Sequence, residues 1–235
     1  SGVAAYLKAV TDKYTVRALL LTLEATLTAV VVNTIFGLFA AWTITKFKFK
    51  GKKLLTTLID IPVTVSPVIA GLIFILLFGR QSVFISDTQS VSHQSCICST
   101  GYYPGNRLCN ISVYSRELIP VLETEGTDEE EAAALMGASG FTIFRKITLP
   151  QMKWSLIYGV ILCTARALGE FGAVNALSKT RGETFTLPLE IDALYMSGTD
   201  SSITSAFAVS SILLIIALII LFARNIVEHK FKKLH

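Results

Sequence analysis

Four long apolar stretches alternate with polar or irregular ones along the chain. They cover residues 18–45, 54–79, 154–175 and 203–223, and the last is the least interrupted. Each is long enough for an α-helix to cross a hydrocarbon core of about 30 Å. The pattern predicts an all-α protein, a polytopic bundle of transmembrane helices. Residues 1–17 are amphipathic and fit either an interfacial helix or a loop.

The second apolar stretch, residues 54–79, is interrupted by Pro62, Ser66 and Pro67. Prolines in a membrane helix free backbone carbonyls, which is tolerated where protein or a water-filled cavity satisfies them. Broken helices of this kind line translocation paths. An equally good interpretation places the first half of the stretch at the membrane interface and only the second half at depth.

Polar residues inside a spanning stretch usually face the bundle interior. In the first stretch these are Glu24 and Asn33, for which a structural contact is the simpler role. In residues 154–175, Arg166 and Glu170 stand four apart, so they share a helix face. They form either an intrahelical ion pair or part of an anion path, in which Arg166 supplies positive potential and Glu170 orients it.

Basic residues gather in short loops. Residues 46–53 carry five lysines, and a second basic group contains Arg116, Arg145, Lys146 and Lys153. Loops rich in Lys and Arg stay in the cytoplasm, so both regions and the basic C-terminus should lie inside. The start of the chain is then expected outside.

Residues 82–115 break this pattern, because topology requires a crossing there and none is visible. The segment is rich in Ser and Cys and lacks periodicity. A long external loop with a disulfide among Cys96, Cys98 and Cys109 is one interpretation. A zinc site that adds His93 fits no usual ligand spacing.

Our hypothesis for this segment is translation out of frame between two compensating insertions or deletions. A one-base shift of the codons for residues 101–114 can yield an apolar helix. Intact coding DNA in the printed frame would disprove the hypothesis.

The loop at residues 116–153 contains a helical hairpin. Four carboxylates at 128–131 favour a helix N-terminus, and residues 132–136 are good helix formers. Gly137 permits a sharp break, after which a second short helix can run until Pro150 stops it. Such a hairpin, with a small-residue face, is a plausible knob for a partner's groove. An ordinary surface hairpin is the simpler alternative.

Composition supports a membrane protein. The 235 residues are 52% hydrophobic, with a mean hydropathy of +0.59. The net charge of +4 is concentrated in short loops, so nucleic acid is not an expected partner. The three histidines are scattered, and no metal-ligand cluster, Ser/His/Asp set or paired carboxylates stand at working spacing. We therefore expect no enzyme, no metal and no cofactor.

The hairpin sequence resembles the EAA loop of ABC-importer permeases at every signature position. These positions are Glu131, Ala132, Ala133, Gly137, Ile147, Leu149 and Pro150. The resemblance implies that the loop lies on the cytoplasmic face and docks into a cleft on an ATPase subunit. ATP hydrolysis is then expected in that partner.

Most of the chain outside 82–115 is similar to the W-type subunit of sulfate/thiosulfate permeases. Residues 165–173, ARALGEFGA, look like the oxyanion permeases in general, including those for molybdate. Residues 181–189, RGETFTLPL, look more like the sulfate W-type subunit. Molybdate or tungstate transport, or a non-functional frame-damaged remnant, are the alternatives.

The resemblance implies a single transmembrane domain over residues 1–235 with the fold of a type I ABC-importer permease. We expect about five spans, the third disrupted at 82–115, and the family's first helix absent. The implied partners are the ATPase, a T-type second permease subunit, an external sulfate-binding protein, and sulfate or thiosulfate. A short amphipathic helix at 187–195 could help dock the binding protein, or simply pack against the bundle. The expected location is the bacterial inner membrane, with a plastid envelope as the alternative.

Overall fold

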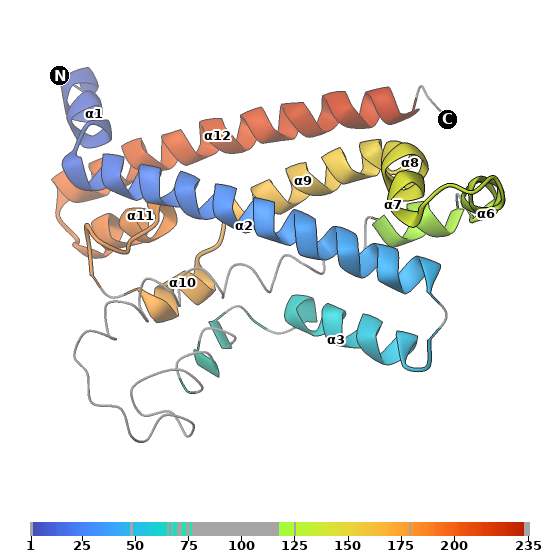
Figure 1. Cartoon of the computed structure of the whole chain (residues 1–235). Coiled ribbons are helices and arrows are strands. Elements are labelled where there is room, and N and C mark those ends of the chain that lie inside the picture. The colour runs from blue at the N-terminus through green and yellow to red at the C-terminus, as the bar shows by residue number, and fades with distance from the viewer. Residues whose placement is uncertain are drawn as a thin grey trace.

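The computed structural model describes residues 2–47, 49–64, 66, 68, 69, 72, 73, 76, 118–124, 126–178 and 180–232. Every regular element in these ranges is helical (Figure 1). The elements are α1 (Gly2–Val10), α2 (Lys13–Lys46), α3 (Lys52–Thr64), α6 (Asp128–Leu135), α7 (Gly140–Ile143), the π-helix η1 (Phe144–Thr148), α8 (Leu149–Gln151), α9 (Lys153–Leu168), α10 (Gly172–Leu177), α11 (Leu187–Met196) and α12 (Asp200–Lys232). Residues 118–124 are also helical.

Helix α2 is the centre of the bundle. It supplies a buried residue to each of the three apolar clusters: Ala41 packs with residues 118–124 and α9, Ala25 with α10 and α11, and Ala18 with α11 and α12. Its 34 residues span about 51 Å at 1.5 Å per residue, so both ends extend past a hydrocarbon core of about 30 Å.

Small residues on α2 let the neighbouring helices pack closely against it. Its buried positions repeat every three or four residues and are nearly all small or polar: Thr15, Ala18, Thr22, Ala25, Thr26, Ala29, Asn33, Gly37, Ala41 and Ile44. A small-residue stripe lets helix backbones approach closely in a membrane. Asn33 is fully buried and its Nδ2 lies 3.9 Å from Cys163 Sγ on α9, which confirms that it faces the bundle. Glu24 is exposed instead.

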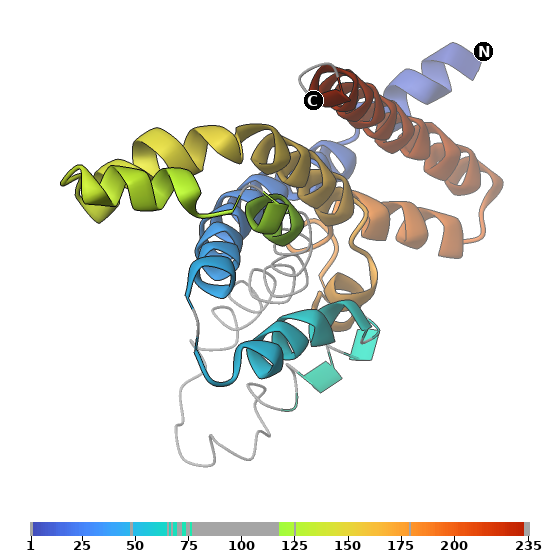
Figure 2. The same cartoon turned by 90° about the vertical axis from the view of Figure 1, so that its right-hand side faces the viewer.

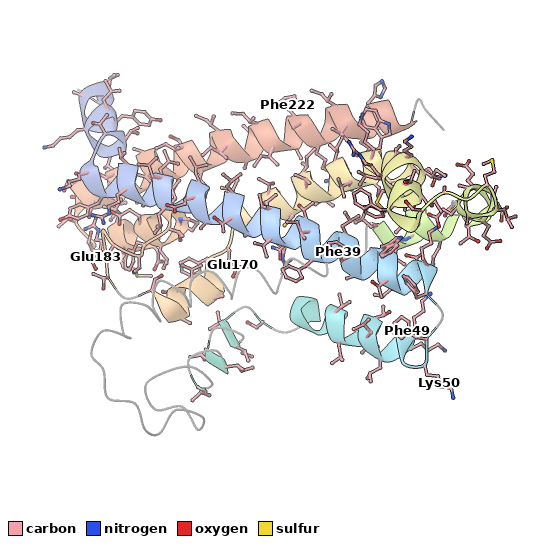
Figure 3. The ribbon with its side chains drawn as sticks, in the orientation of Figure 1. Phe39, Phe49, Lys50, Glu170, Glu183 and Phe222 are labelled. Carbon is pink, nitrogen blue, oxygen red and sulfur yellow. The ribbon has the colours of Figure 1, made fainter. Side chains whose placement is uncertain are left out.

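Three helical segments are long and apolar enough to cross a membrane: Lys13–Lys46, Lys153–Ala176, which takes in α9 and most of α10, and Asp200–His229. They contain the spans predicted at 18–45, 154–175 and 203–223. Large apolar side chains are exposed along them, among them Phe39 and Phe222 (Figure 3). The predicted stretch 54–79 is described mainly through α3, and residues 82–115 lie outside the described residues.

The inner ends of the helices gather at one end of the molecule. The end of α2, the α6–α8 segment, the start of α9 and the end of α12 lie together in Figure 1. Figure 2 looks onto this end and shows the α6–α8 segment projecting beyond α2 and away from α12. The basic regions at 46–53 and 145–153 and the end of α12 therefore share one side, as the charge pattern predicts.

The opposite end is formed by α1, α10, α11 and the starts of α2 and α12 (Figure 1). Residues 2–10 form a helix, and Tyr6 Oη lies 2.7 Å from Ser211 Oγ of α12. Helix α11 confirms the short helix predicted at 187–195, with Pro188 in its first turn.

One predicted helix is interrupted. We expected residues 154–175 to be continuous, but α9 ends at Leu168, with Gly169 at its C-cap, and α10 restarts at Gly172. Arg166 and Glu170 consequently do not share a helix face, and the intrahelical ion pair is wrong. Glu170 Oε1 instead accepts a hydrogen bond from Ala173 N (3.2 Å), because a carboxylate can satisfy the free N–H groups of the next helical turn.

Candidate functional site

The acidic start of α6 is built from local interactions. Its first turn holds Asp128, Glu129, Glu130 and Glu131, whose charges favour the positive end of the helix dipole. Thr127 Oγ1 donates a hydrogen bond to Glu131 Oε1 at 3.0 Å. Gln151 Nε2 donates to Glu129 Oε2 at 2.9 Å, which connects α6 to α8.

Gly137 makes the break that the sequence predicted. Its φ of +86° lies in the left-handed region, which favours glycine. Gly137 N donates to Ala134 O and Ala138 N donates to Ala133 O, both at 3.0 Å, and these bonds close the end of α6. Ser139 then caps α7, because its Oγ accepts from Thr142 N at 3.4 Å.

Pro150 does not stop the second helix as predicted. It stands in the first turn of α8, a position that tolerates proline, and the chain continues through Met152 into α9. Because proline cannot donate to the carbonyl four residues earlier, the preceding turn is irregular. That turn is η1, in which Leu149 N donates to Phe144 O, five residues back.

Large apolar side chains are exposed around the Gly137 turn. The exposed fractions are 90% for Leu135, 81% for Met136 and 73% for Phe141. They lie at the basic end of the bundle, beyond the spanning part of α9. Exposed apolar side chains that cluster outside the hydrocarbon region are typical of a protein-binding surface.

The signature residues divide between this surface and its support. Glu131, Ala132, Gly137 and Pro150 are exposed. Ala133 is buried, while Ile147 and Leu149 are partly buried. Leu149 packs against the cluster of Ala41, Leu118, Leu122, Met152 and Cys163, so this cluster fixes the loop to the bundle.

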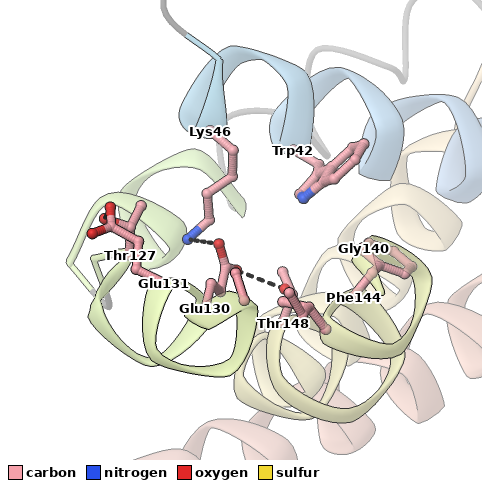
Figure 4. Close-up of a pocket in the computed structure, with 10 residues that line it drawn as sticks. Trp42, Lys46, Thr127, Glu130, Glu131, Gly140, Phe144 and Thr148 are labelled. Carbon is pink, nitrogen blue, oxygen red and sulfur yellow. Dashed lines mark hydrogen bonds and ion pairs between the residues drawn. The ribbon is translucent and has the colours of Figure 1, made fainter. Parts of the chain in front are cut away.

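The end of α2 is joined to the loop by an ion pair that the sequence did not predict. Lys46 Nζ lies 3.1 Å from Glu130 Oε2 and donates to Gly126 O at 2.6 Å. Glu130 Oε1 accepts a hydrogen bond from Thr148 Oγ1 at 2.6 Å (Figure 4). Lys46, Glu130 and Thr148, with Trp42 and Phe144, line a groove of about 280 Å³. The lysine-rich loop predicted topology from the sequence, but the ion pair was not predictable because Glu130 lies more than eighty residues from Lys46 in the sequence.

The structure places the residues predicted for a translocation path on different elements, and it shows no hydrogen bond or ion pair between those of them that it describes. Arg166 lies on α9, and its Nε is buried without a hydrogen-bond partner. Glu170 is buried beside α10 (Figure 3). Pro62 belongs to α3 and Ser66 is exposed, while Pro67 lies outside the described residues. In the described part of the chain, no three His, Cys, Asp or Glu side chains gather as metal ligands.

A second charged cluster fixes the loop between α10 and α11 at the opposite end. Arg181 Nε lies 3.0 and 3.1 Å from the two carboxylate oxygens of Glu190, whose side chain is 1% exposed. The Arg181 guanidinium also lies over the Tyr14 ring, 5.2 Å from its centroid. The hydrogen bonds to Glu190 raise the pKa of Arg181, so this cation persists at any physiological pH.

Comparison with known proteins identifies the family. Residues 33–233 match the model of the binding-protein-dependent transport system inner membrane component. The sulfate transport system permease protein CysW of Escherichia coli K12 is 40% identical over 232 residues, covering 97% of this chain and 77% of that protein. CysW of Synechococcus elongatus is 42% identical over 220 residues (91% and 76%). Sulfate permease 2, chloroplastic, of Chlamydomonas reinhardtii is 37% identical over 228 residues (97% and 61%).

Solved structures show the same fold at low identity. A bacterial ABC transporter involved in the import of alginate matches with a TM-score of 0.74 at 17% identity, covering 96% of this chain and 83% of that one. The MetNI methionine ABC transporter matches with a TM-score of 0.62 at 18% identity (92% and 93%). These matches confirm the predicted fold of an ABC-importer permease. The chain belongs to the inner membrane components of binding-protein-dependent transport systems.

Proposed function

We propose that this chain is a permease subunit of an ATP-driven importer of sulfate or thiosulfate. The identity to CysW proteins over nearly the whole chain supports the substrate class. The RGETFTLPL segment at 181–189, which resembles the W-type subunit, supports the same choice. In this proposal the chain is one transmembrane domain that forms part of the anion path and hydrolyses no ATP itself.

The 128–150 loop is the proposed contact with an ATP-binding cassette ATPase. The observation that carries this proposal is the complete signature at the basic end of the bundle, with Leu135 and Met136 exposed beside the Gly137 turn. Burying two such side chains in a partner's cleft is favourable, since apolar area removed from water contributes about 25 cal/mol per Å². The exposed carboxylates of Asp128, Glu129 and Glu131 would favour a cleft with basic residues at its edge, since charge complementarity improves the orientation and rate of docking.

The other proposed partners are a T-type sulfate permease subunit and an external sulfate-binding protein. The binding protein would approach the end opposite the 128–150 loop, where α11 and the 180–184 turn lie (Figure 1). The proposed location is a bacterial inner membrane. The chloroplastic relative supports a plastid envelope as the alternative.

Arg166 is the proposed cation of the anion path. Its partly buried position on α9 and its unpartnered Nε fit a group that contacts an oxyanion, because guanidinium donors match oxyanion geometry. Glu170, Pro62, Ser66 and Pro67 are proposed to shape the same path. Arg166→Gln should reduce uptake while ATPase docking is retained.

Uptake of radiolabelled sulfate in a strain without its own sulfate permease tests the function. Expression of this chain with its partner subunits should restore uptake, and excess thiosulfate should compete. Competition by molybdate alone would reassign the substrate to molybdate or tungstate. A chain that neither inserts in the membrane nor co-purifies with an ATPase subunit would instead be the frame-damaged remnant.

A further inference from the structure

Lys46 connects the central helix to the start of the 128–150 loop. It is the last residue of α2, where a cation favours the negative end of the helix dipole. Its side chain is only 9% exposed, and its ammonium reaches both Glu130 Oε2 (3.1 Å) and Gly126 O (2.6 Å). One side chain therefore holds both the first turn of α6 and the backbone just before that helix.

Glu130 uses its other carboxylate oxygen for a different element. Its Oε1 accepts the hydrogen bond from Thr148 of η1 at 2.6 Å, and its side chain is 15% exposed. Trp42, one turn before Lys46, packs edge-on against Phe144 of η1 with ring centroids 5.5 Å apart. The inner end of α2, α6 and η1 thus form one junction (Figure 4).

This junction differs from an ordinary surface ion pair. Exposed pairs contribute about 0–1 kcal/mol because water and salt screen them. Here both side chains are mostly buried and carry further hydrogen bonds, conditions under which breaking a pair leaves a charge without its partner. Lys52 and Glu123 offer the contrast: they lie 3.7 Å apart with side chains 40% and 54% exposed.

We infer that the Lys46–Glu130 pair transmits displacement of α6 to α2. The inference rests on the proposed function, in which an ATPase moves the exposed side of the α6–α7 turn. A packed helix and a hydrogen-bonded ion pair form a contiguous mechanical connection. Because α2 contributes to all three apolar clusters, movement at its inner end reaches α9, α11 and α12. Neither residue is a signature position of the loop, since Glu130 precedes Glu131.

The test uses the complete transporter, reconstituted with its ATPase, second permease and binding protein. Lys46→Ala and Glu130→Gln should keep the ATPase bound but lower the sulfate transported per ATP hydrolysed by about 2- to 30-fold, the effect expected of a coupling network. The exchanged pair Lys46→Glu/Glu130→Lys should recover part of this ratio. Recovery is expected to be partial because each exchanged charge opposes its helix dipole. Lys52→Ala is the matched control and should leave the ratio unchanged.

Three results would show, respectively, that the pair transmits no movement, that it only positions the loop, or that the proposed function itself is wrong. Single variants with the wild-type ratio and normal docking would overturn the inference. Loss of ATPase docking in both single variants would also overturn it, because the pair would then only position the loop. Absence of sulfate transport by the wild-type assembly would instead reject the proposed function. If a Lys46 variant fails to insert, Thr148→Val removes the third member of the junction without changing charge, and a wild-type ratio in that variant would equally refute transmission.

Discussion

At the scale of single residues, Gly137 controls the shape of the 128–150 loop. Its φ of +86° is required for the turn, and no atom outside Gly137 and its two chain neighbours lies within 4 Å of the position where a Cβ would stand. A substitution would therefore strain the backbone without producing a clash. Strain of this kind costs roughly 1–2 kcal/mol for an ordinary L-residue and less for asparagine.

Replacing Gly137 should weaken docking of the ATPase only through strain in the backbone of the turn. We expect Gly137→Ala to weaken ATPase binding about 5- to 30-fold, and Gly137→Asn to weaken it less. Co-purification of the ATPase at graded concentrations measures the change. Gly140→Ala is the control, because Gly140 also has open space around it but no positive φ. Equal effects of Gly137→Ala and Gly140→Ala would argue against this role of the turn.

The exposed apolar residues beside the turn give a second prediction. Leu135→Ser and Met136→Ser should each weaken ATPase binding about tenfold or more, since burial of such a side chain contributes roughly 1.5–3 kcal/mol. Met196→Ser is the matched control, because Met196 is similarly exposed at the opposite end of the molecule. Unchanged binding in both loop variants would place the ATPase contact elsewhere.

At the scale of elements, the Arg181–Glu190 pair fixes the loop between α10 and α11. Gly182 makes the adjacent turn, with a φ of +83° and the Tyr14 ring so close that a Cβ would lie 2.8 Å from Cε1. Thr22 Oγ1 of α2 accepts a hydrogen bond from Leu187 N at 2.8 Å, at the start of α11. Together these contacts hold the outer loop against α2.

Removing Arg181 should destabilise this end of the bundle. Arg181→Ala leaves the buried Glu190 carboxylate without its cation, which costs about 3–5 kcal/mol for a fully buried pair and less here because Arg181 is partly exposed. We expect a lower Tm in detergent micelles. Arg181→Met combined with Glu190→Met should recover most of the loss, since no charge remains buried. A Tm unaffected by Arg181→Ala would contradict a stabilising role.

Sequence patterns predicted the spanning helices at 18–45 and 203–223 well, because the length of an apolar stretch is a local property. They also predicted the Gly137 turn, which depends on one residue's backbone. They missed the break after Leu168 because apolar residues resume directly after Glu170, so residues 154–175 have the length and composition of one spanning helix. The Lys46–Glu130 pair could not be predicted from the sequence, because only the packing of α2 against the loop brings the two residues together.

At the scale of the whole molecule, the basic regions define one side of the membrane. The ends of α2 and α12 and the whole α6–α8 segment lie there, while α11 lies at the other end (Figure 1). An even number of crossings must therefore separate the end of α2 from the loop. The predicted second and third spans would supply them, and sequencing the coding DNA across residues 82–115 tests the third.

Cysteine labelling in intact cells should reproduce this sidedness. In a background with the four native cysteines replaced and the ATPase subunit not expressed, Lys50→Cys and Met136→Cys should react only with membrane-permeant maleimides. Met196→Cys should also react with an impermeant reagent. Labelling of positions 50 and 136 from opposite sides would refute the shared inner face.

The most direct test of the central claim is site-specific photocrosslinking to the ATPase. A photoreactive amino acid replaces Met136 in the assembled transporter, and the same substitution at Met196 serves as the comparison. We predict a crosslinked product that contains this chain and the ATPase from position 136 and none from position 196. A product from 196 alone, or none from 136 in a complex that transports sulfate, would contradict the proposed coupling through the 128–150 loop.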